Sequence, residues 1–450
     1  MADGFRPYLV DQMHLLPQSP RDWLPENHLA FFVHDLVSQL DLGPILRTYK
    51  HGRGPRGYHP QMLLTVLLYG YCVGVFSSRK IAAHCETDLA FRVLSGGEFP
   101  DFRTLAEYRR RHLPAFHAFF IEVLGLCRET GMLELGHLSL DGSKYQANAS
   151  KHKAMSYGRI QAVEPPLAEE VERLLREAER IDAAEDRRLG RQVRGDELPQ
   201  ELRRREGRLE KIRAAKERLE ARARERARAS QEARGASPQE VAAAAARAVP
   251  HAREQSNFTD PESRIMKTKT GWVQGYNAQV MVEEQSGLIV AHEVAAQGAD
   301  SPRLVPMLDQ TDRNLAAIGL AAAARLPGVF TADAGYCSER NLLALAERGI
   351  DSYVATGRER HGRAGIDPQG RPRTPRRTAM REKLQTAAGR AIYARRKVIT
   401  EPVHGLIKHA RGFRQFLLRG LEKVQAEFTL IALTHNLLKL WRTHLATARA

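Results

Sequence analysis

Hydrophobic and polar positions along the chain divide it into a helical first part and a later part where strands and helices alternate. Between residues 25 and 135, apolar side chains recur at the spacing of one buried helix face. We expect one helix over 28–42, one that starts at Pro60, one that starts at Ser77 and one over 88–94. A further helix should follow a cap at Asp101 or Thr104. Two short helices followed by a basic helix fit a helix-turn-helix DNA reader, and they fit plain helical packing equally well.

From His137 onward, short alternating or continuous apolar runs predict strands. The expected strands are 137–143, 272–282, 288–294, 329–333 and 350–355. Helices are expected from Ser301 to about Ala317 and from a cap at Ser338 to Gly349. A loop rich in proline, glycine and arginine is expected over 357–390, and helices resume near Thr400. This order predicts an α/β fold with a mixed five-stranded sheet and flanking helices, which is the order that a ribonuclease-H-like fold requires.

A charged segment, residues 148–265, interrupts this fold after its first strand. Residues 164–234 carry 18 acidic and 20 basic side chains, with apolar residues at helical spacing. Gly195 and Pro199 break the pattern in its middle, so we expect a helical hairpin laced with ion pairs. The stretches Val241–Ala248 and Pro250–Gln255 indicate a loose linker.

Charge is unevenly distributed along the chain. Its 69 Lys and Arg against 53 Asp and Glu give a formal net charge of +16. Residues 357–423 hold 18 of these basic residues against 5 acidic ones. So dense a basic tract favours a polyanionic partner, because neutralising phosphates releases counterions. A merely solvated surface is the alternative, and charge alone does not separate DNA from RNA or a membrane surface.

Cysteine use and the N-terminus bear on the compartment. The four cysteines lack CxxC or zinc-finger spacing, so they are expected as buried residues in a reducing compartment. No signal-peptide pattern is found at the N-terminus, and the apolar run from Met62 to Phe76 is too short to span a bilayer. We therefore expect a cytosolic protein with no membrane partner.

Two aspartates have the setting of metal ligands. Asp141-Gly142 and Asp333-Ala334-Gly335 each fall at or near the end of an expected strand. Glycine permits a tight turn where the chain leaves the sheet, so each carboxylate would project beyond the edge. Mg²⁺ takes a few carboxylate oxygens together with waters and substrate phosphate oxygens. Two such ions activate an attacking hydroxyl and stabilise the leaving oxygen of a phosphodiester.

Glu401 is the best candidate for a third carboxylate. Pro402 follows it, so Glu401 is expected at the start of a helix. One side of this helix is apolar, and the other is a polar stripe of Glu401, His404, Lys408, Arg411 and Gln415. Each acid also has an ordinary structural role open to it, as a turn or helix cap or as a complement to the helix dipole. The combination beside the basic tract favours catalysis.

Four segments resemble bacterial insertion-sequence transposases of the DDE superfamily. They are Leu138–Ser150, Asp260–Lys267 with Gly275–Gln279, Thr331–Tyr336, and Tyr393–Lys397 through Glu401–Lys408. The last is similar to the signature of Tyr, Arg, Glu and Lys around the final glutamate. That signature often has three residues between Arg and Glu, whereas Arg396 leaves four and Lys397 leaves three. The similarity covers nearly the whole chain.

The resemblance implies a ribonuclease-H-like catalytic core, dependence on Mg²⁺ with Mn²⁺ as a substitute, and two ions. It implies that Asp141, Asp333 and Glu401 are the catalytic and metal-binding residues. The residues expected at the DNA are Tyr393, Arg396, Lys397, Lys408 and Arg411. The expected domains are a helical DNA-binding domain over 1–135, a catalytic domain over 136–147 and 266–450, and the charged insertion over 148–265.

The function expected is that of a transposase that binds the terminal inverted repeats of an insertion sequence, cuts DNA and joins it to a target. Its partner is double-stranded DNA, and synapsis of two ends implies a homodimer or larger complex in the bacterial cytoplasm at the nucleoid. No small-molecule cofactor is expected. The alternatives are a decayed or repurposed transposase that only binds DNA, and a metal-dependent nuclease that never joins ends. A zinc hydrolase is disfavoured, because no His, Cys and carboxylate set has ligand spacing.

Overall fold

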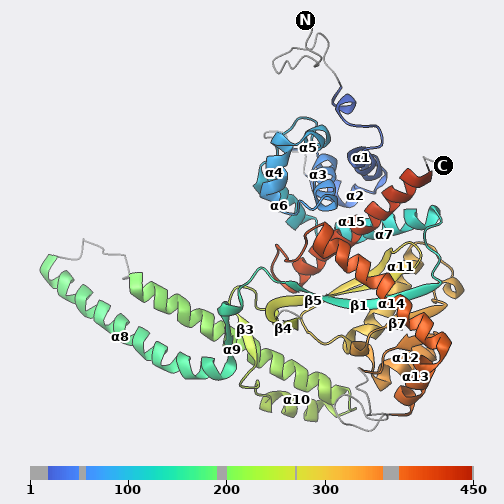
Figure 1. Ribbon diagram of the computed structural model, residues 1–450. Helices are drawn as coiled ribbons and strands as arrows, with labels where there is room; N and C mark the ends of the chain where they lie inside the picture. The colour runs from blue at the N-terminus through green and yellow to red at the C-terminus, as the bar shows by residue number, and fades with distance from the viewer. Residues whose placement is uncertain (1–18, 50–56, 190–199, 269–270, 358–373, 448–450) are drawn as a thin grey trace, which may run out of the picture.

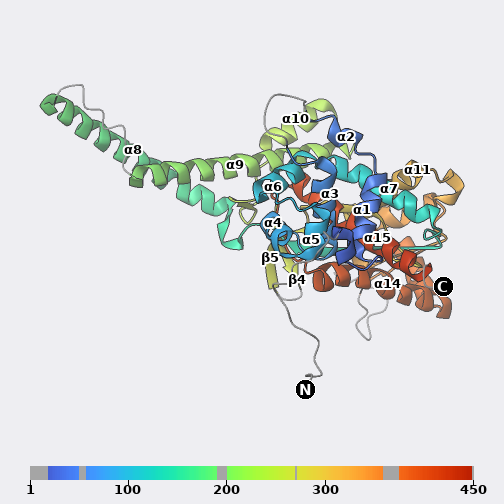
Figure 2. The same ribbon diagram turned by 90° about the horizontal axis from the view of Figure 1, so that it is seen from above.

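The computed structural model describes residues 19–49, 57–189, 200–268, 271–357 and 374–447. Figure 1 shows the N-terminal helices at one end, a mixed sheet in the middle and a long helical arm that projects sideways from the sheet. Viewed from above, the arm extends well beyond the rest of the molecule (Figure 2). In the described part of the chain, no helix combines the length and apolar character that crossing a bilayer demands.

The N-terminal part is helical, as its apolar periodicity predicts. After a short 3-10 turn, Pro20–Trp23, its helices are α1 (Leu29–Gln39), α2 (Gly43–Leu46), α3 (Pro60–Cys72), α4 (Ser78–Thr87), α5 (Leu89–Leu94), α6 (Phe102–Arg111) and α7 (Ala115–Glu129). Of the two predicted caps, Asp101 is the one used: it accepts a hydrogen bond from the Arg103 amide at 2.7 Å. The buried positions face one continuous core.

The basic helix α6 packs closely against its neighbours. Arg109 is buried and donates to the Tyr71 hydroxyl at 3.0 Å and to the Phe76 carbonyl at 3.1 Å. Arg110 pairs with Glu107 on the same helix. Arg109 therefore supports the packing interpretation of this segment and is not available to read DNA bases.

Within the described part of the chain, the central sheet has six strands, one more than expected. They are β1 (His137–Gln146), β4 (Arg264–Thr268), β5 (Gly271–Glu283), β6 (Ile289–Ala295), β7 (Val329–Ala332) and β8 (Ser352–Val354). The order is β4-β5-β1-β7-β8, and β6 also pairs with β5. β5 runs antiparallel to β1, β4 and β6, whereas β1, β7 and β8 are parallel. This mixed α/β architecture is consistent with a ribonuclease-H-like domain.

The additional strand β4 exists because β6 pairs with only part of β5. Residues 277–282 of β5 pair with β6, and its first residues, 271–275, continue past the end of β6. Their backbone donors and acceptors need partners, and residues 264–268 supply them. The sequence pattern showed the apolar run of β5 but not this second pairing.

Helices pack on the sheet and connect it to the N-terminal part. α11 (Leu304–Ala317) follows a 3-10 turn, Ser301–Arg303, and packs on β6, and α12 (Glu339–Glu347) lies between β7 and β8 in the chain. Ser338 caps α12 as predicted, but Ser301 does not cap α11, because it lies inside the preceding turn. α15 (Leu421–Thr447) contacts α3, α7 and β6. Most of its first two thirds is buried, because sheet and N-terminal helices cover it from different sides.

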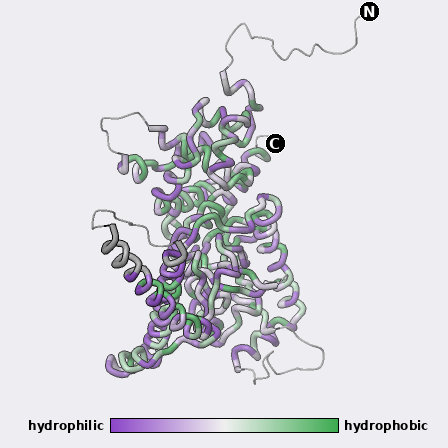
Figure 3. Tube along the Cα trace, turned by 90° about the vertical axis from the view of Figure 1, so that its left-hand side faces the viewer, coloured by the Kyte–Doolittle hydropathy of each residue, from purple (hydrophilic) through white to green (hydrophobic). Residues whose placement is uncertain are grey.

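The charged insertion forms the helical arm. It comprises α8 (Tyr157–Leu189), α9 (Gln200–Glu232) and α10 (Pro238–Arg247), with two short paired strands, β2 (Ala154–Ser156) and β3 (Gln255–Asn257), at its base. Hydrophilic residues, purple in Figure 3, are frequent along it. Ion pairs such as Glu164–Lys216 at 2.8 Å cross between α8 and α9, as expected. The predicted break at Gly195 and Pro199 lies outside the described residues.

Two expectations for loops are wrong. The stretch 241–247 is not a linker but part of α10, which begins with a capping box of Ser237 and Glu240. Residues 248–254 are irregular, as expected, and β3 starts at Gln255. The expected loop 357–390 contains α13 (Pro375–Gln385) and the start of α14 (Ala387–Gly405); residues 358–373 lie outside the described part. Glu401 and Pro402 are therefore inside a helix and not at its start.

The helix α14 passes through Pro402 without a break. A proline inside a helix removes one backbone donor and crowds the carbonyl one turn earlier, here that of Val398. Val398 is 68% exposed, so water can satisfy that carbonyl. A π-helical turn, Leu406–Ala410, follows directly.

Candidate active site

Asp141 and Asp333 lie side by side because β1 and β7 are parallel neighbours. The ladder between these strands ends with the pair Leu140 and Ala332, and each aspartate is the next residue. Parallel strands present residues of matched register at the same edge. The register therefore brings together two carboxylates that are separated by the whole arm in sequence.

Contrary to the expectation, neither Gly142 nor Gly335 serves to turn the chain out of the sheet. β1 does not end at Gly142 but continues to Gln146, paired with β5, and neither Gly142 nor Gly335 has a positive φ. Both are needed for space. A Cβ at Gly142 would collide with the Gln279 amide and lie 2.9 Å from Asp300 Oδ1. At Gly335 it would lie 3.0 Å from both Asp300 Oδ2 and Asp333 Oδ1.

Both aspartates are in environments that disfavour their charged forms. Burial raises the pKa of Asp141 to about 6, with a further contribution from the charge of Asp333, while Arg396 opposes the shift. Burial also raises the pKa of Asp333, and the nearby charge of Asp300 acts in the same direction. A cation held between such carboxylates would relieve both costs. Oxygen donors of this kind suit Mg²⁺ or Mn²⁺.

One face of α14 lies against Asp141. The Arg396 guanidinium is 3.5 Å from Asp141 Oδ2, and the Thr400 hydroxyl donates to the same oxygen at 3.3 Å. The ring of Tyr393, one turn earlier, lies 5.8 Å from the Arg396 guanidinium. The structure thus places Arg396 beside a candidate metal ligand, where its charge offsets that of the carboxylate.

Glu401 is next to this face but is not part of it. It follows Thr400 directly, and its side chain is exposed. No hydrogen bond or ion pair joins Glu401 to Asp141 or Asp333 among the described residues. Likewise, the described residues contain no group of three His, Cys, Asp or Glu side chains arranged to hold a metal. The structure therefore assembles two of the three expected carboxylates.

The other expected DNA contacts have different surroundings. Lys397 is exposed on α14. Lys408 turns toward β1, donating to Ser143 Oγ at 2.5 Å and to the Lys144 carbonyl at 2.9 Å. Burial and the charge of Lys144 lower its pKa to about 8. Lys408 thus lies in the site rather than on an outer DNA-binding surface.

Arg411 does not fit the DNA contact that we expected. It is buried, and its guanidinium donates to the carbonyls of Tyr71 and Ile431 and to the Thr434 hydroxyl. These acceptors belong to α3 and α15. The expected polar stripe does not continue to this residue, because the helix has ended and the chain at Arg411 is no longer helical. Arg411 joins the N-terminal helices to the C-terminal part.

Several site residues were missed by the sequence reasoning. Asp300, between β6 and α11, accepts hydrogen bonds from Asn277 and Gln279 of β5 and from Lys144 of β1. Gln279 in turn accepts a hydrogen bond from the Tyr336 hydroxyl. The available signal was the presence of Asn277 and Gln279 in a strand rich in apolar residues, because buried amides require partners.

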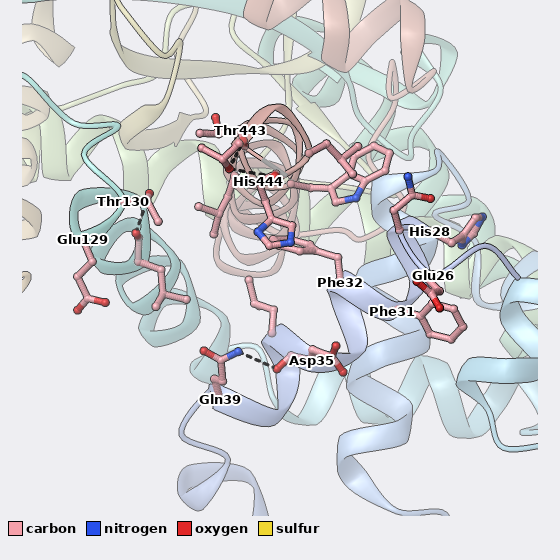
Figure 4. A pocket seen from close by; sticks show the side chains of 17 residues that line it. Glu26, His28, Phe31, Phe32, Asp35, Gln39, Glu129, Thr130, Thr443 and His444 are labelled. Atoms are coloured by element: carbon pink, nitrogen blue, oxygen red, sulfur yellow. Dashed lines mark hydrogen bonds between the residues drawn. The ribbon is translucent and has the colours of Figure 1, made fainter. Parts of the chain in front are cut away.

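Two hollows bear on the location of the site. A groove of about 640 Å³ lies between α1, α7 and α15, and Figure 4 shows Phe31, Phe32 and His444 among its lining residues. None of the candidate site residues lines it. A second pocket, of about 750 Å³, lies between α13 and α14 and is lined by Arg381, Arg390, Tyr393 and Lys397 among others. This basic pocket shares Tyr393 with the neighbourhood of the carboxylates.

Comparison with known protein families agrees with this geometry. Residues 238–437 match the family described as Transposase DDE domain, and residues 18–111 match Transposase domain (DUF772). The two matches together span more than half of the chain. The first includes Asp333 and Glu401 and begins after Asp141. No curated protein and no solved structure matches. The chain belongs to the insertion-sequence transposases of the DDE superfamily.

Proposed function

We propose that this transposase binds the terminal inverted repeats of a bacterial insertion sequence, cuts the DNA at the element's ends and joins the freed ends to target DNA. The observation that carries the proposal is the juxtaposition of Asp141 and Asp333 at the end of the β1–β7 ladder, with Arg396 beside them. Paired carboxylates flanked by cations suit a reaction at a phosphodiester, which brings its own negative charge.

Asp141 and Asp333 would hold one or two Mg²⁺ ions, for which Mn²⁺ is a substitute. Bound there, such ions activate the attacking hydroxyl and stabilise the leaving oxygen. Glu401 would complete the ligand set. Its place directly after Thr400, which contacts Asp141, supports this, because a rotation of its side chain or a small shift of α14 would turn the carboxylate toward the site.

The basic residues would position the DNA. Lys397 is exposed on α14, and Tyr393, Arg381 and Arg390 line the adjacent pocket, so a phosphate backbone on this face would meet several donors. Arg396 and Lys408 would stabilise negative charge at the reacting phosphate. The helical domain over 1–135 would contribute binding to the element's ends. Bringing two ends together would require a homodimer or larger complex in the bacterial cytoplasm.

The test is metal-dependent cleavage of a duplex that carries the element's end. Wild type should nick it in Mg²⁺, and Asp141→Asn or Asp333→Asn should lower the rate by at least about 100-fold, because the ligated metal supplies several kcal/mol to the transition state. DNA binding, measured by gel shift, should persist. Glu422→Gln, on an exposed glutamate of α15, is the matched control.

Glu401→Gln is tested separately. A loss similar to that of the aspartate variants supports Glu401 as the third ligand, whereas full activity would remove it from the site. Wild type that shifts the duplex without nicking it at any Mg²⁺ or Mn²⁺ concentration would favour a protein that only binds DNA. Strand-transfer products separate a transposase from a nuclease that never joins ends.

A further inference from the structure

We propose that Asp300 is a positioning residue of the active site: it holds Lys144 as a counter-ion and keeps that ammonium away from Asp333. The aspartate pair then stays available to a divalent cation. This inference rests on the proposed function, since it concerns the same site, and it assigns a role to two residues outside the expected three carboxylates.

The hydrogen bonds of Asp300 fix it in one orientation. Its Oδ1 accepts from Asn277 at 2.6 Å, from Gln279 at 2.9 Å and from Lys144 Nζ at 3.3 Å. Lys144 Nζ is also 3.5 Å from Oδ2. The two charged side chains are only 18% and 19% exposed, so solvent screens their attraction weakly. Two strands of the sheet thus supply the donors that hold this carboxylate.

Two glycines make room for the Asp300 carboxylate. Asp300 lies between Gly142 and Gly335, the glycines near the two catalytic aspartates, and a side chain at either would reach its carboxylate within 3.0 Å. Tyr336, next to Gly335, is tied to Gln279, which also bonds Asp300. The contacts of Asp300 therefore connect β5 to both segments that carry the aspartates.

The charges explain why such a residue is needed. Arg396 already lies 3.5 Å from Asp141. Lys144 is close to Asp333 as well: it binds Asp300, and a Cβ at Gly335 would lie 3.0 Å from an oxygen of both Asp300 and Asp333. If Lys144 also paired with Asp333, both aspartates would be neutralised by fixed cations, and a divalent ion would gain little by binding. Pairing with Asp300 gives the Lys144 ammonium a different partner.

The bonding of Asp300 favours this role over that of a direct metal ligand. Three donors, one of them cationic, converge on Oδ1, and the same ammonium lies 3.5 Å from Oδ2, so a metal would have to compete with Lys144 for this carboxylate. A positioning role depends on the charge of Asp300 relative to that of Lys144. A ligand role would depend on the carboxylate itself. The two roles predict different results when both charges are removed.

The experiment measures Mn²⁺ binding to the full chain without DNA, by calorimetry or electron paramagnetic resonance. The Mn²⁺ binding that is lost in Asp141→Asn is taken as binding at the proposed site. Asp300→Asn keeps the shape and the acceptor oxygen but frees Lys144, and it should weaken Mn²⁺ binding by roughly 10- to 100-fold. Lys144→Gln should bind Mn²⁺ at least as tightly as wild type. The double variant should recover to within about threefold of wild type, because charge balance is restored.

Unchanged Mn²⁺ affinity in Asp300→Asn would overturn the proposal. So would a double variant no better than Asp300→Asn, which is the result expected of a direct ligand or a purely structural residue. Wild type without an Asp141-dependent Mn²⁺ site would overturn it as well. Thermal melting of each variant shows whether it is folded. Recovery of Mn²⁺ affinity in the double variant also could not result from a loss of folding.

Failure of this proposal and failure of the proposed function are separable. If wild type cuts DNA in an Asp141-dependent manner but the Mn²⁺ pattern fails, only the role of Asp300 is rejected. If the Mn²⁺ pattern is found but no duplex is cut, the transposition chemistry is rejected and the cation site remains.

Discussion

Replacing Arg411 with alanine tests whether this residue contacts DNA or holds the molecule together. The structure places its guanidinium in the interior, where burial lowers its pKa to about 10, so it is still cationic at neutral pH. Its donors reach the Tyr71 carbonyl at 2.9 and 3.1 Å and the Ile431 carbonyl at 3.1 Å. We therefore expect the substitution to destabilise the fold rather than to weaken DNA binding selectively.

The expected loss of stability can be worked out from the buried acceptors that Arg411→Ala would leave without a donor. Each buried polar group left without a partner costs about 1–3 kcal/mol, and hydrogen bonds from a charged group are at the upper end. The Tyr71 carbonyl loses both of its Arg411 donors, and the Ile431 carbonyl and Thr434 hydroxyl lose one each. Partial replacement by water gives an expected loss of about 3–5 kcal/mol in the free energy of unfolding.

Urea unfolding followed by circular dichroism measures this loss, with Arg340→Ala on the exposed surface of α12 as the matched control. The control should change the free energy of unfolding by less than about 0.5 kcal/mol. A DNA contact would behave differently: stability would be unchanged, and the salt dependence of DNA binding would fall by about one unit. That outcome would refute the structural role of Arg411.

Two further predictions concern the site and the core. Gly142→Ala should lower stability by about 1–3 kcal/mol and slow DNA cleavage, because its Cβ would displace Gln279 and Asp300, whereas Gly136→Ala has open space and should be silent. Melting temperatures and nicking rates of the two variants check this, and equal behaviour would contradict it. Burial lowers the pKa of His292 to about 3, so only the unfolded chain gains its proton between pH 6.5 and 3. As the pH falls through that window, His292 should lower the free energy of unfolding by about 1.4 kcal/mol per pH unit. Urea titrations at pH 7 and 5.5 should therefore show a smaller loss of stability in His292→Gln than in wild type. An equal loss in both would count against the burial of His292.

The local pattern of the sequence predicted most element types correctly. Apolar spacing or a cap marked α1 and α3 to α6 but not α2, and five of the six described strands of the sheet were expected near their observed positions. These features are visible locally because a helix or strand buries one side, and the period of that side depends only on nearby residues. Asp141 and Asp333 were found for the same reason, since each follows a short apolar run.

Helix limits that depend on tertiary contacts were not visible in the sequence. Pro402 indicated a helix start, but α14 begins at Ala387, because Thr386 caps it and the sheet stabilises it through β1. The sequence analysis placed Arg411 on a polar helix face, which requires the helix to continue that far. In the structure the helix ends after the π-helical segment, and Arg411 is buried. A helical period holds only as far as the helix continues.

The amino-acid sequence by itself determined the alternation of strands and helices, the charged arm, the basic tract, and the presence of two aspartates next to strands. Only the tertiary structure decided that β1 pairs with β7 in the register that makes those aspartates neighbours, that Asp300 pairs with Lys144, and that Glu401 is exposed. The physical reason is that strand pairing and the spacing of charges are long-range relations. They depend on which surfaces exclude water together, and no local pattern of residues encodes that.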